Sequence, residues 1–166
     1  MQNPNDENKP QLPMNNLGQK AVEIAISKIG MKEQGGANMG PIVEWSMKPW
    51  TKAKVGAWAE WCCAFVCTCL YEAGLPIKKV ASTNVKTLWE NCERSKLAWI
   101  SYNTPTQRMP IPGDIVFFVG LGHVGICEKV EGRVVHTIEG NFGDQVRRDH
   151  HDMAEGHFHG FAHVGN

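Results

Sequence analysis

Hydrophobic residues recur at helical spacing near the start of the chain. Within residues 17–30 they fall on one side of a helix, at Leu17, Ala21, Ile24, Ala25 and Ile29. Gly30 follows, and glycine commonly ends a helix. We therefore expect a helix with one buried face over this stretch. The preceding residues 1–16 are polar and contain too few apolar side chains to offset the entropy of ordering them, so they predict a flexible leader.

A second helix is predicted over residues 62–74, which read CCAFVCTCLYEAG. Apolar side chains occupy nearly every position, and Gly74 followed by Pro76 ends the helix. Cys67 and Cys69 lie in the middle of this helix, where we expect them to be buried as small hydrophobic residues. This helix carries four of the six cysteines in the chain, and Cys62 and Cys63 lie in its first turn.

Strand patterns dominate the second half of the chain. Residues 115–119, 123–129 and 133–141 are strand-like and are separated by glycine-bearing turns, which predicts an antiparallel meander. Helices followed by strands indicate an α+β fold, with N-terminal helices packed on a central antiparallel β-sheet. The length of the chain fits one domain, which we place at residues 17–166.

The turn between the last two of these strands decides whether His123 and Glu139 share a face of the sheet. A three-residue loop at 130–132, with Gly132 in the left-handed conformation, places His123 opposite Glu139. A two-residue loop of Glu131 and Gly132 places them on opposite faces. The sequence permits both loops. Only the first gives the imidazole a carboxylate neighbour that fixes its tautomer and raises its basicity.

Charge and composition narrow the range of functions. The chain has 17 basic and 17 acidic side chains and no long run of like charges, so we expect binding neither to nucleic acid nor to a membrane. Neither a secretion signal nor a membrane span is visible in the sequence. We therefore expect synthesis in the cytoplasm, where cysteines stay reduced.

The cysteines of the second helix admit two kinds of chemistry. Unpaired backbone N–H groups and the helix dipole stabilise a thiolate in the first turn, at Cys62 or Cys63. Alternatively, Cys63 and Cys67 are four residues apart and share a helix face, where they and histidines of the C-terminal tail offer ligands for zinc. The tail lacks a recurrent ligand spacing, so we expect its histidines to be solvated loop residues. They are His150, His151, His157, His159 and His163.

Four motifs in this order carry a family resemblance: WCCAFV, PGDIVFF, GHVGICEKVEG and HTIEGN. Together they resemble the CHAP amidase/peptidase family of the NlpC/P60 superfamily, and the resemblance extends over roughly residues 17–164. It implies a papain-like fold. It also implies Cys62 as the nucleophile, His123 as the base, Glu139 as the residue that orients the base, and Asn141 as an auxiliary polar residue.

The same motifs suggest where a substrate binds. Glycines around His123 leave one edge of its ring open to a substrate backbone. We therefore predict substrate contacts at Gly122 and Gly125, and a further one at Trp61 beside the expected nucleophile. One position departs from the family pattern, because alanine or serine often follows the nucleophile and Cys63 stands there.

Members of this family cut peptidoglycan, so the resemblance implies hydrolysis of a cell-wall amide. The bond is either the N-acetylmuramoyl-L-alanine amide or a peptide bond of the stem or cross-bridge. We expect a monomer that acts at the wall as a phage endolysin. A toxin secreted between bacteria, with an immunity protein as partner, is the alternative. No aspartate lies between Asp6 and Asp114 to form a calcium loop, so we expect no metal and no cofactor.

Two other classes of protein fit the sequence. A zinc-binding or redox module built on the cysteine-rich helix contains stoichiometric metal when purified. A non-catalytic wall-binding module binds sacculi, leaves them intact, and has a helix-start thiol of ordinary reactivity.

Overall fold

The computed structural model describes residues 16–54, 60–99 and 108–165. Of the predicted leader, residues 1–15 lie outside this part, and Asn16 already begins the first helix. The α-helices are α1 (Asn16–Ser27), α2 (Pro41–Met47), α3 (Cys62–Ala73) and α4 (Val85–Arg94). The short 3-10 helices are η1 (Ile77–Lys79), η2 (Val119–Leu121) and η3 (Met153–Glu155). The strands are β1 (Ala98–Trp99), β2 (Ile115–Phe118), β3 (Val124–Glu131), β4 (Val134–Glu139), β5 (Arg147–Asp152) and β6 (Phe158–Ala162).

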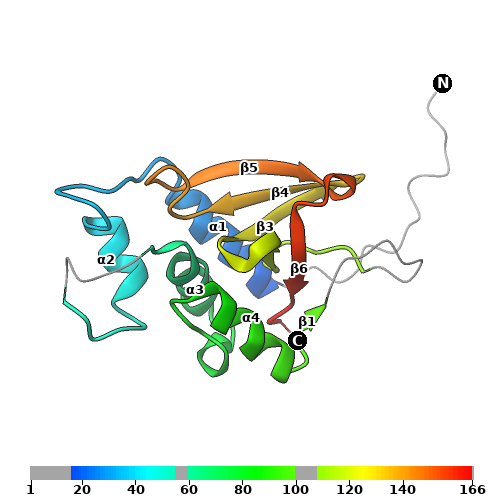
Figure 1. Ribbon diagram of the computed structural model, residues 1–166, viewed down its shortest axis with the longest axis horizontal. Helices are drawn as coiled ribbons and strands as arrows, with labels where there is room; N and C mark the ends of the chain where they lie inside the picture. The colour runs from blue at the N-terminus through cyan, green and yellow to red at the C-terminus, as the bar shows by residue number, and fades with distance from the viewer. Residues whose placement is uncertain (1–15, 55–59, 100–107, 166) are drawn as a thin grey trace.

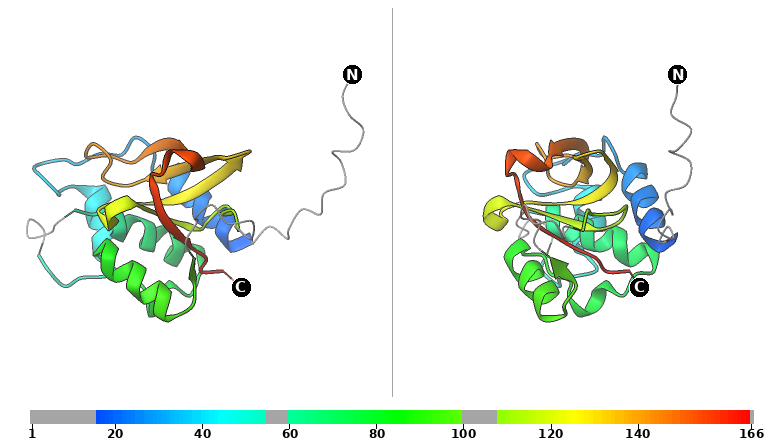
Figure 2. Two further views of the ribbon diagram at one scale, coloured as in Figure 1. Left: turned by 45° about the vertical axis from the view of Figure 1, so that its right-hand side comes forward. Right: turned by 90° about the vertical axis from the view of Figure 1, so that its right-hand side faces the viewer.

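The described strands form one antiparallel sheet in the order β1-β6-β2-β3-β4-β5. Helices α1 and α3 pack against β3 and β4, and α4 lies beside β1 (Figure 1). The views in Figure 2 show the sheet as one layer and α3 and α4 together on one side of it. The architecture is the predicted α+β fold, with helices from the first half of the chain packed on an antiparallel sheet.

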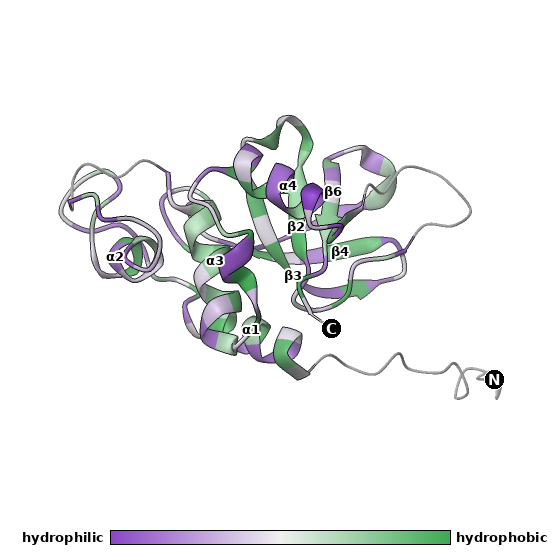
Figure 3. Ribbon diagram, turned by 90° about the horizontal axis from the view of Figure 1, so that it is seen from below, coloured by the Kyte–Doolittle hydropathy of each residue, from purple (hydrophilic) through white to green (hydrophobic). Residues whose placement is uncertain are grey.

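The hydrophobic core has two parts because side chains alternate across the sheet. On β2, Ile115 and Phe117 face the large core with the helices, whereas Val116 faces a smaller cluster with Phe158 and Phe161. Figure 3 shows hydrophobic residues along β2 and in the first half of β3, and these are the parts of the two strands that are buried. Within the described residues, no helix is long and apolar enough to cross a membrane.

Helix α3 matches its prediction closely. It begins at Cys62, and Gly74 caps it in the left-handed conformation with φ 97°. All four of its cysteines are buried, which agrees with the apolar pattern on every side. The helix therefore runs through the core, with its N-terminus directed at one end of the sheet.

The β3–β4 hairpin has neither of the two loops expected from the sequence. Glu131 pairs with Val134, so the turn is Gly132 and Arg133, and Gly132 adopts the predicted left-handed φ of 62°. A bulge between Cys127 and Lys129 then shifts the register by one residue. The two-residue turn alone would place His123 and Glu139 on opposite faces of the sheet, and the extra residue in the bulge returns them to the same face. His123 and Glu139 consequently meet, as only the three-residue loop had predicted.

The C-terminal tail corrects a second expectation. Its histidines were predicted to be solvated loop residues, but His150 and His151 lie on β5 and His159 on β6. His151 is largely buried against the rings of Phe118 and Phe158. Strand β5 was not predicted because its sequence, RRDHHD, lacks the alternation of apolar and polar residues that indicates a strand.

Candidate active site

The N-terminus of α3 presents Cys62 to a cleft. This cleft, of about 270 Å³, is lined by Cys62, Glu60, Thr83, Asn84, Val85, Leu121 and Gly122. Cys62 retains 3% of its surface exposed, whereas Cys63, Cys67 and Cys69 are fully buried. The first N–H groups of a helix lack partners within the helix and favour negative charge nearby. Of the cysteines on α3, Cys62 is therefore the one placed to act as a nucleophile.

Two glycines allow close packing around the end of β4, one against α3 and one against β3. A Cβ atom on Gly140 would lie 2.6 Å from the Cβ of Phe65, one turn along α3 from Cys62. A Cβ on Gly125 would lie 2.8 Å from the Cγ of Glu139. Both positions therefore require glycine because of close packing. They hold the Glu139 side chain against β3, next to the start of α3.

His123 and Glu139 form a close pair. The His123 Nε2 atom lies 2.7 Å from Oε2 of Glu139, and the carboxylate is only 2% exposed. The Thr137 hydroxyl donates to the other oxygen, Oε1, at 2.5 Å. With Nε2 engaged by Glu139, Nδ1 is the imidazole nitrogen available to Cys62. The predicted contact between His123 and Glu139 is confirmed.

The pKa of His123 reflects these neighbours. Burial lowers it, but hydrogen bonds with Cys62 and Glu139 and the charges of both raise the pKa from 6.5 to about 10. The protonated imidazole is thus stabilised between a sulfur and a carboxylate. An imidazole in this setting can take the proton of the Cys62 thiol and hold it as part of an ion pair.

The other cysteines have environments that suit packing. The Cys63 thiol donates to the Ser82 carbonyl at 3.0 Å, and its pKa is raised by a hydrogen bond with Cys67 and by burial. Burial also raises the pKa of Cys92 to about 12. Among the described residues, the cysteines of α3 belong to no cluster of three or more metal-ligating side chains. Cys63 and Cys67 therefore behave as small core residues.

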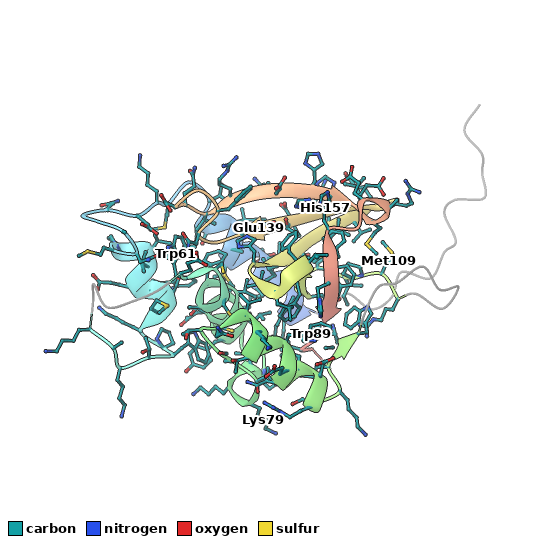
Figure 4. The ribbon with its side chains drawn as sticks, viewed as in Figure 1. Trp61, Lys79, Trp89, Met109, Glu139 and His157 are labelled. Carbon is teal, nitrogen blue, oxygen red and sulfur yellow. The ribbon has the colours of Figure 1, made fainter. Side chains whose placement is uncertain are left out.

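The structure changes two of the three predicted substrate contacts. Trp61 is fully buried, and its indole N–H donates to Glu33 at 2.8 Å, so a direct substrate contact by its side chain is wrong. Gly125 lies beneath Glu139 and allows the two strands to pack, which is a structural role. Gly122 lines the cleft and has open space where a Cβ would point. Its substrate contact remains a prediction. Figure 4 labels Trp61 and Glu139.

Asn141 lies in the wall of a second, larger cleft and does not line the Cys62 cleft. This cleft has a volume of about 610 Å³ and is lined mostly by polar residues between 32 and 38 and between 141 and 145. Asn141 adopts a left-handed φ of 56°. Glu60 lines both clefts, so the two hollows adjoin on either side of that residue. The auxiliary role of Asn141 remains a prediction.

Two parts of the site were not predicted from the sequence. They are Thr137, which donates to Glu139, and the wall of the Cys62 cleft at the start of α4. The alternation of β4 already places Thr137 on the face of Glu139, so the signal for it was present. The N-cap of α4 is Asn84, whose side chain accepts from the Thr87 N–H at 3.0 Å. The helix was also visible in the sequence, as a polar cap followed by apolar residues at helical spacing. These are Val85, Leu88, Trp89 and Cys92.

Comparison with known proteins shows the family of the chain. The model of the CHAP domain family matches residues 51–141, which is more than half of the chain and includes Cys62, His123, Glu139 and Asn141. The chain therefore belongs to the CHAP domain family. Among curated proteins, no sequence match was found.

Solved structures give a more distant likeness. The crystal structure of Ly7917 is 17% identical with a TM-score of 0.48, and the match covers 87% of this chain and 61% of that chain. The crystal structure of Ly7917 with the hydrolyzing product of MDP is 18% identical with a TM-score of 0.42, covering 92% and 64%. The chain thus spans less than two thirds of the length of these Ly7917 chains.

Proposed function

We propose that this protein is a peptidoglycan hydrolase that cleaves a cell-wall amide bond with Cys62 as its nucleophile. One observation carries the proposal: His123 lies between the thiol of Cys62 and the buried carboxylate of Glu139. A nucleophile, a base and a group that orients the base are the parts that nucleophilic catalysis requires. Membership in the CHAP domain family supports peptidoglycan as the substrate.

The proposed reaction has two halves. His123 takes the proton of Cys62, and the thiolate attacks the amide carbonyl, whose oxygen gains the negative charge. Backbone N–H groups at the start of α3, including that of Cys62, stabilise this oxyanion. The intermediate then collapses, the C–N bond breaks, and His123 returns the proton to the leaving amine. Water attacks the resulting thioester with His123 as base and releases the acid and the free thiol.

Glu139 keeps the imidazole in position during both halves. Because its Oε2 accepts from Nε2, the ring presents Nδ1 to the sulfur throughout. The Cys62 cleft and the larger cleft adjoin at Glu60, and we assign them to the two sides of the scissile bond.

Sacculus digestion tests the proposal. The unmodified protein should release fragments from purified sacculi, and mass spectrometry of the new ends identifies the bond. A free lactyl carboxylate on muramic acid together with an N-terminal L-alanine indicates the amidase, whereas new termini within the stem peptide or cross-bridge indicate the endopeptidase. Cys62→Ala should lower the rate at least about a thousandfold while the circular dichroism spectrum stays unchanged. The matched variant Cys63→Ala should keep at least about a tenth of the activity, because Cys63 donates to Ser82 in the core.

An active Cys62→Ala protein would exclude the proposed nucleophile. Sacculi that are bound but left intact by the unmodified protein would identify the wall-binding module instead. Stoichiometric zinc that is lost when Cys63 or Cys67 is replaced would identify the metal module. The endolysin and toxin settings remain predictions, which neighbouring lysis or immunity genes would separate.

A further inference from the structure

Three metal-ligating side chains converge beside the candidate active site. They are Glu139 on β4 and Asp149 and His151 on β5, and their ligand atoms all lie within 4.8 Å of one another. The register pairs Thr137 with Asp149 and Glu139 with Arg147, so alternation directs these residues to one face of the sheet. Paired strands hold such groups in fixed positions.

The distances suit a small cation. His151 Nε2 lies 3.4 Å from Oδ2 of Asp149 and 3.9 Å from Oε1 of Glu139. Tetrahedral zinc with bonds of about 2.0–2.1 Å separates its ligands by roughly 3.3 Å. Small side-chain rotations are therefore enough to bring all three atoms onto one ion.

A second observation concerns His151 itself. Its Nε2 atom is buried and has no hydrogen-bond partner among the described residues, although two carboxylates lie within ion-pair distance. Buried polar nitrogens are nearly always paired. The ring is held by edge contacts with Phe118 and Phe158, so it cannot easily turn towards solvent. A cation placed between the carboxylates would give Nε2 a partner.

We propose that Glu139, Asp149 and His151 form an inhibitory site for a divalent transition metal, with Zn²⁺ as the ion that fits best. An imidazole nitrogen with two carboxylate oxygens is a donor set typical of zinc, and it leaves a fourth position for water. Hard cations such as Mg²⁺ prefer oxygen ligands throughout. Asp149 and His151 remain 29% and 19% exposed, so an ion can enter from solvent.

The site shares Glu139 with the active site, through the two oxygens of one carboxylate. Oε2 accepts from His123, and Oε1 faces the cluster. A cation on Oε1 withdraws negative charge from the carboxylate and weakens its hold on His123. Metal binding should therefore slow the reaction. The inhibition rests on the proposed function, whereas the binding does not.

Calorimetry on metal-free protein with Cys62 replaced by alanine tests the binding, because that change removes the thiol as a competing ligand. We expect one Zn²⁺ per chain. Adding His151→Phe, which keeps the aromatic contacts, or Asp149→Asn should weaken binding on the order of tenfold or more. His136→Phe is the matched control, since His136 contacts Glu131 elsewhere on the sheet, and it should bind normally. Absence of zinc binding, or binding unchanged by His151→Phe, would overturn the site.

Sacculus digestion with Cys62 intact tests the inhibition. Zn²⁺ should slow the unmodified protein and EDTA should restore its rate, while His151→Phe and Asp149→Asn keep the basal rate and resist zinc. Equal inhibition of the variants would mean that zinc acts elsewhere, for example on Cys62, and would overturn the regulatory role. A protein that binds zinc at this site but digests nothing would contradict the proposed function and leave the metal site standing.

Discussion

Two histidine–carboxylate pairs lie at strand ends of the same sheet with almost the same distance between imidazole nitrogen and carboxylate oxygen. In the first, His123 lies 2.7 Å from Glu139, and in the second, Nδ1 of His163 lies 2.6 Å from Oδ1 of Asp114. Both carboxylates are buried and both imidazoles are partly exposed. The pairs by themselves therefore do not reveal which one does chemistry.

Their surroundings separate them. The first pair contacts Cys62, which opens into a cleft at a helix N-terminus. The second pair lies near Cys127, a fully buried thiol whose pKa is raised by burial and by the charge of Asp114. Asp114 also accepts from the backbone N–H of Ile111, so it fixes the chain where β2 begins. A cysteine at a helix start and an open cleft, added to the pair, distinguish the candidate site.

The largest expected difference between the pairs is in activity. His123→Ala should lower the rate of sacculus digestion by about 10²–10⁴-fold, the usual contribution of a general acid–base group. His163→Ala should leave the rate within about twofold but lower the free energy of unfolding by about 1–3 kcal/mol, because Asp114 loses a buried partner. Urea unfolding measures the second effect. Equal loss of activity in both variants would remove the distinction.

A smaller effect concerns the close packing of Gly140 on Phe65 of α3, which positions the neighbouring Glu139. Gly140→Ala should lower the free energy of unfolding by about 1–3 kcal/mol, because the added methyl group meets Phe65. Activity should fall as well, since Glu139 is the preceding residue. Gly122→Ala is the matched control because its Cβ points into open space, and it should unfold at the same urea concentration. If Gly140→Ala is as stable and active as the unmodified protein, close packing does not position Glu139.

The smallest expected effect concerns the carboxylate oxygen that does not contact a histidine, which is Oε1 of Glu139 and Oδ2 of Asp114. Oδ2 of Asp114 accepts a hydrogen bond from the backbone N–H of Ile111, whereas Oε1 of Glu139 accepts one from the Thr137 hydroxyl. Thr137→Val should lower kcat about tenfold with little change in KM, because it frees the carboxylate that orients His123. Thr137→Ser keeps the hydroxyl and should restore kcat. A valine variant with unchanged kcat would show that Glu139 needs no second anchor.

The sequence predicted the parts of the molecule that have strong local patterns. Helix α3, strands β2, β3 and β4, and the meeting of His123 with Glu139 all followed from periodicity, glycine positions and the four motifs. The hairpin loop was wrong because nothing in the sequence marked the bulge near Glu128. Local pattern alone does not determine where an extra residue enters a strand.

The features that were predicted wrongly depend on long-range packing. Strand β5 is a polar edge strand whose pairing with β4 depends on the fold, so its histidines looked like loop residues. Trp61 seemed suited to a substrate because it precedes Cys62, yet its indole is fully buried. Burial of a single side chain follows from the whole core, which one motif does not describe.

Alkylation of the native protein tests the central claim most directly. Iodoacetamide at one equivalent should modify Cys62, the one cysteine on α3 with exposed surface, and activity should fall in proportion to that label. Peptide mapping by mass spectrometry locates the modified residue. We predict label at Cys62 and complete loss of sacculus digestion when labelling is complete. Full activity with Cys62 alkylated, or inactivation by label confined to another cysteine, would contradict the account.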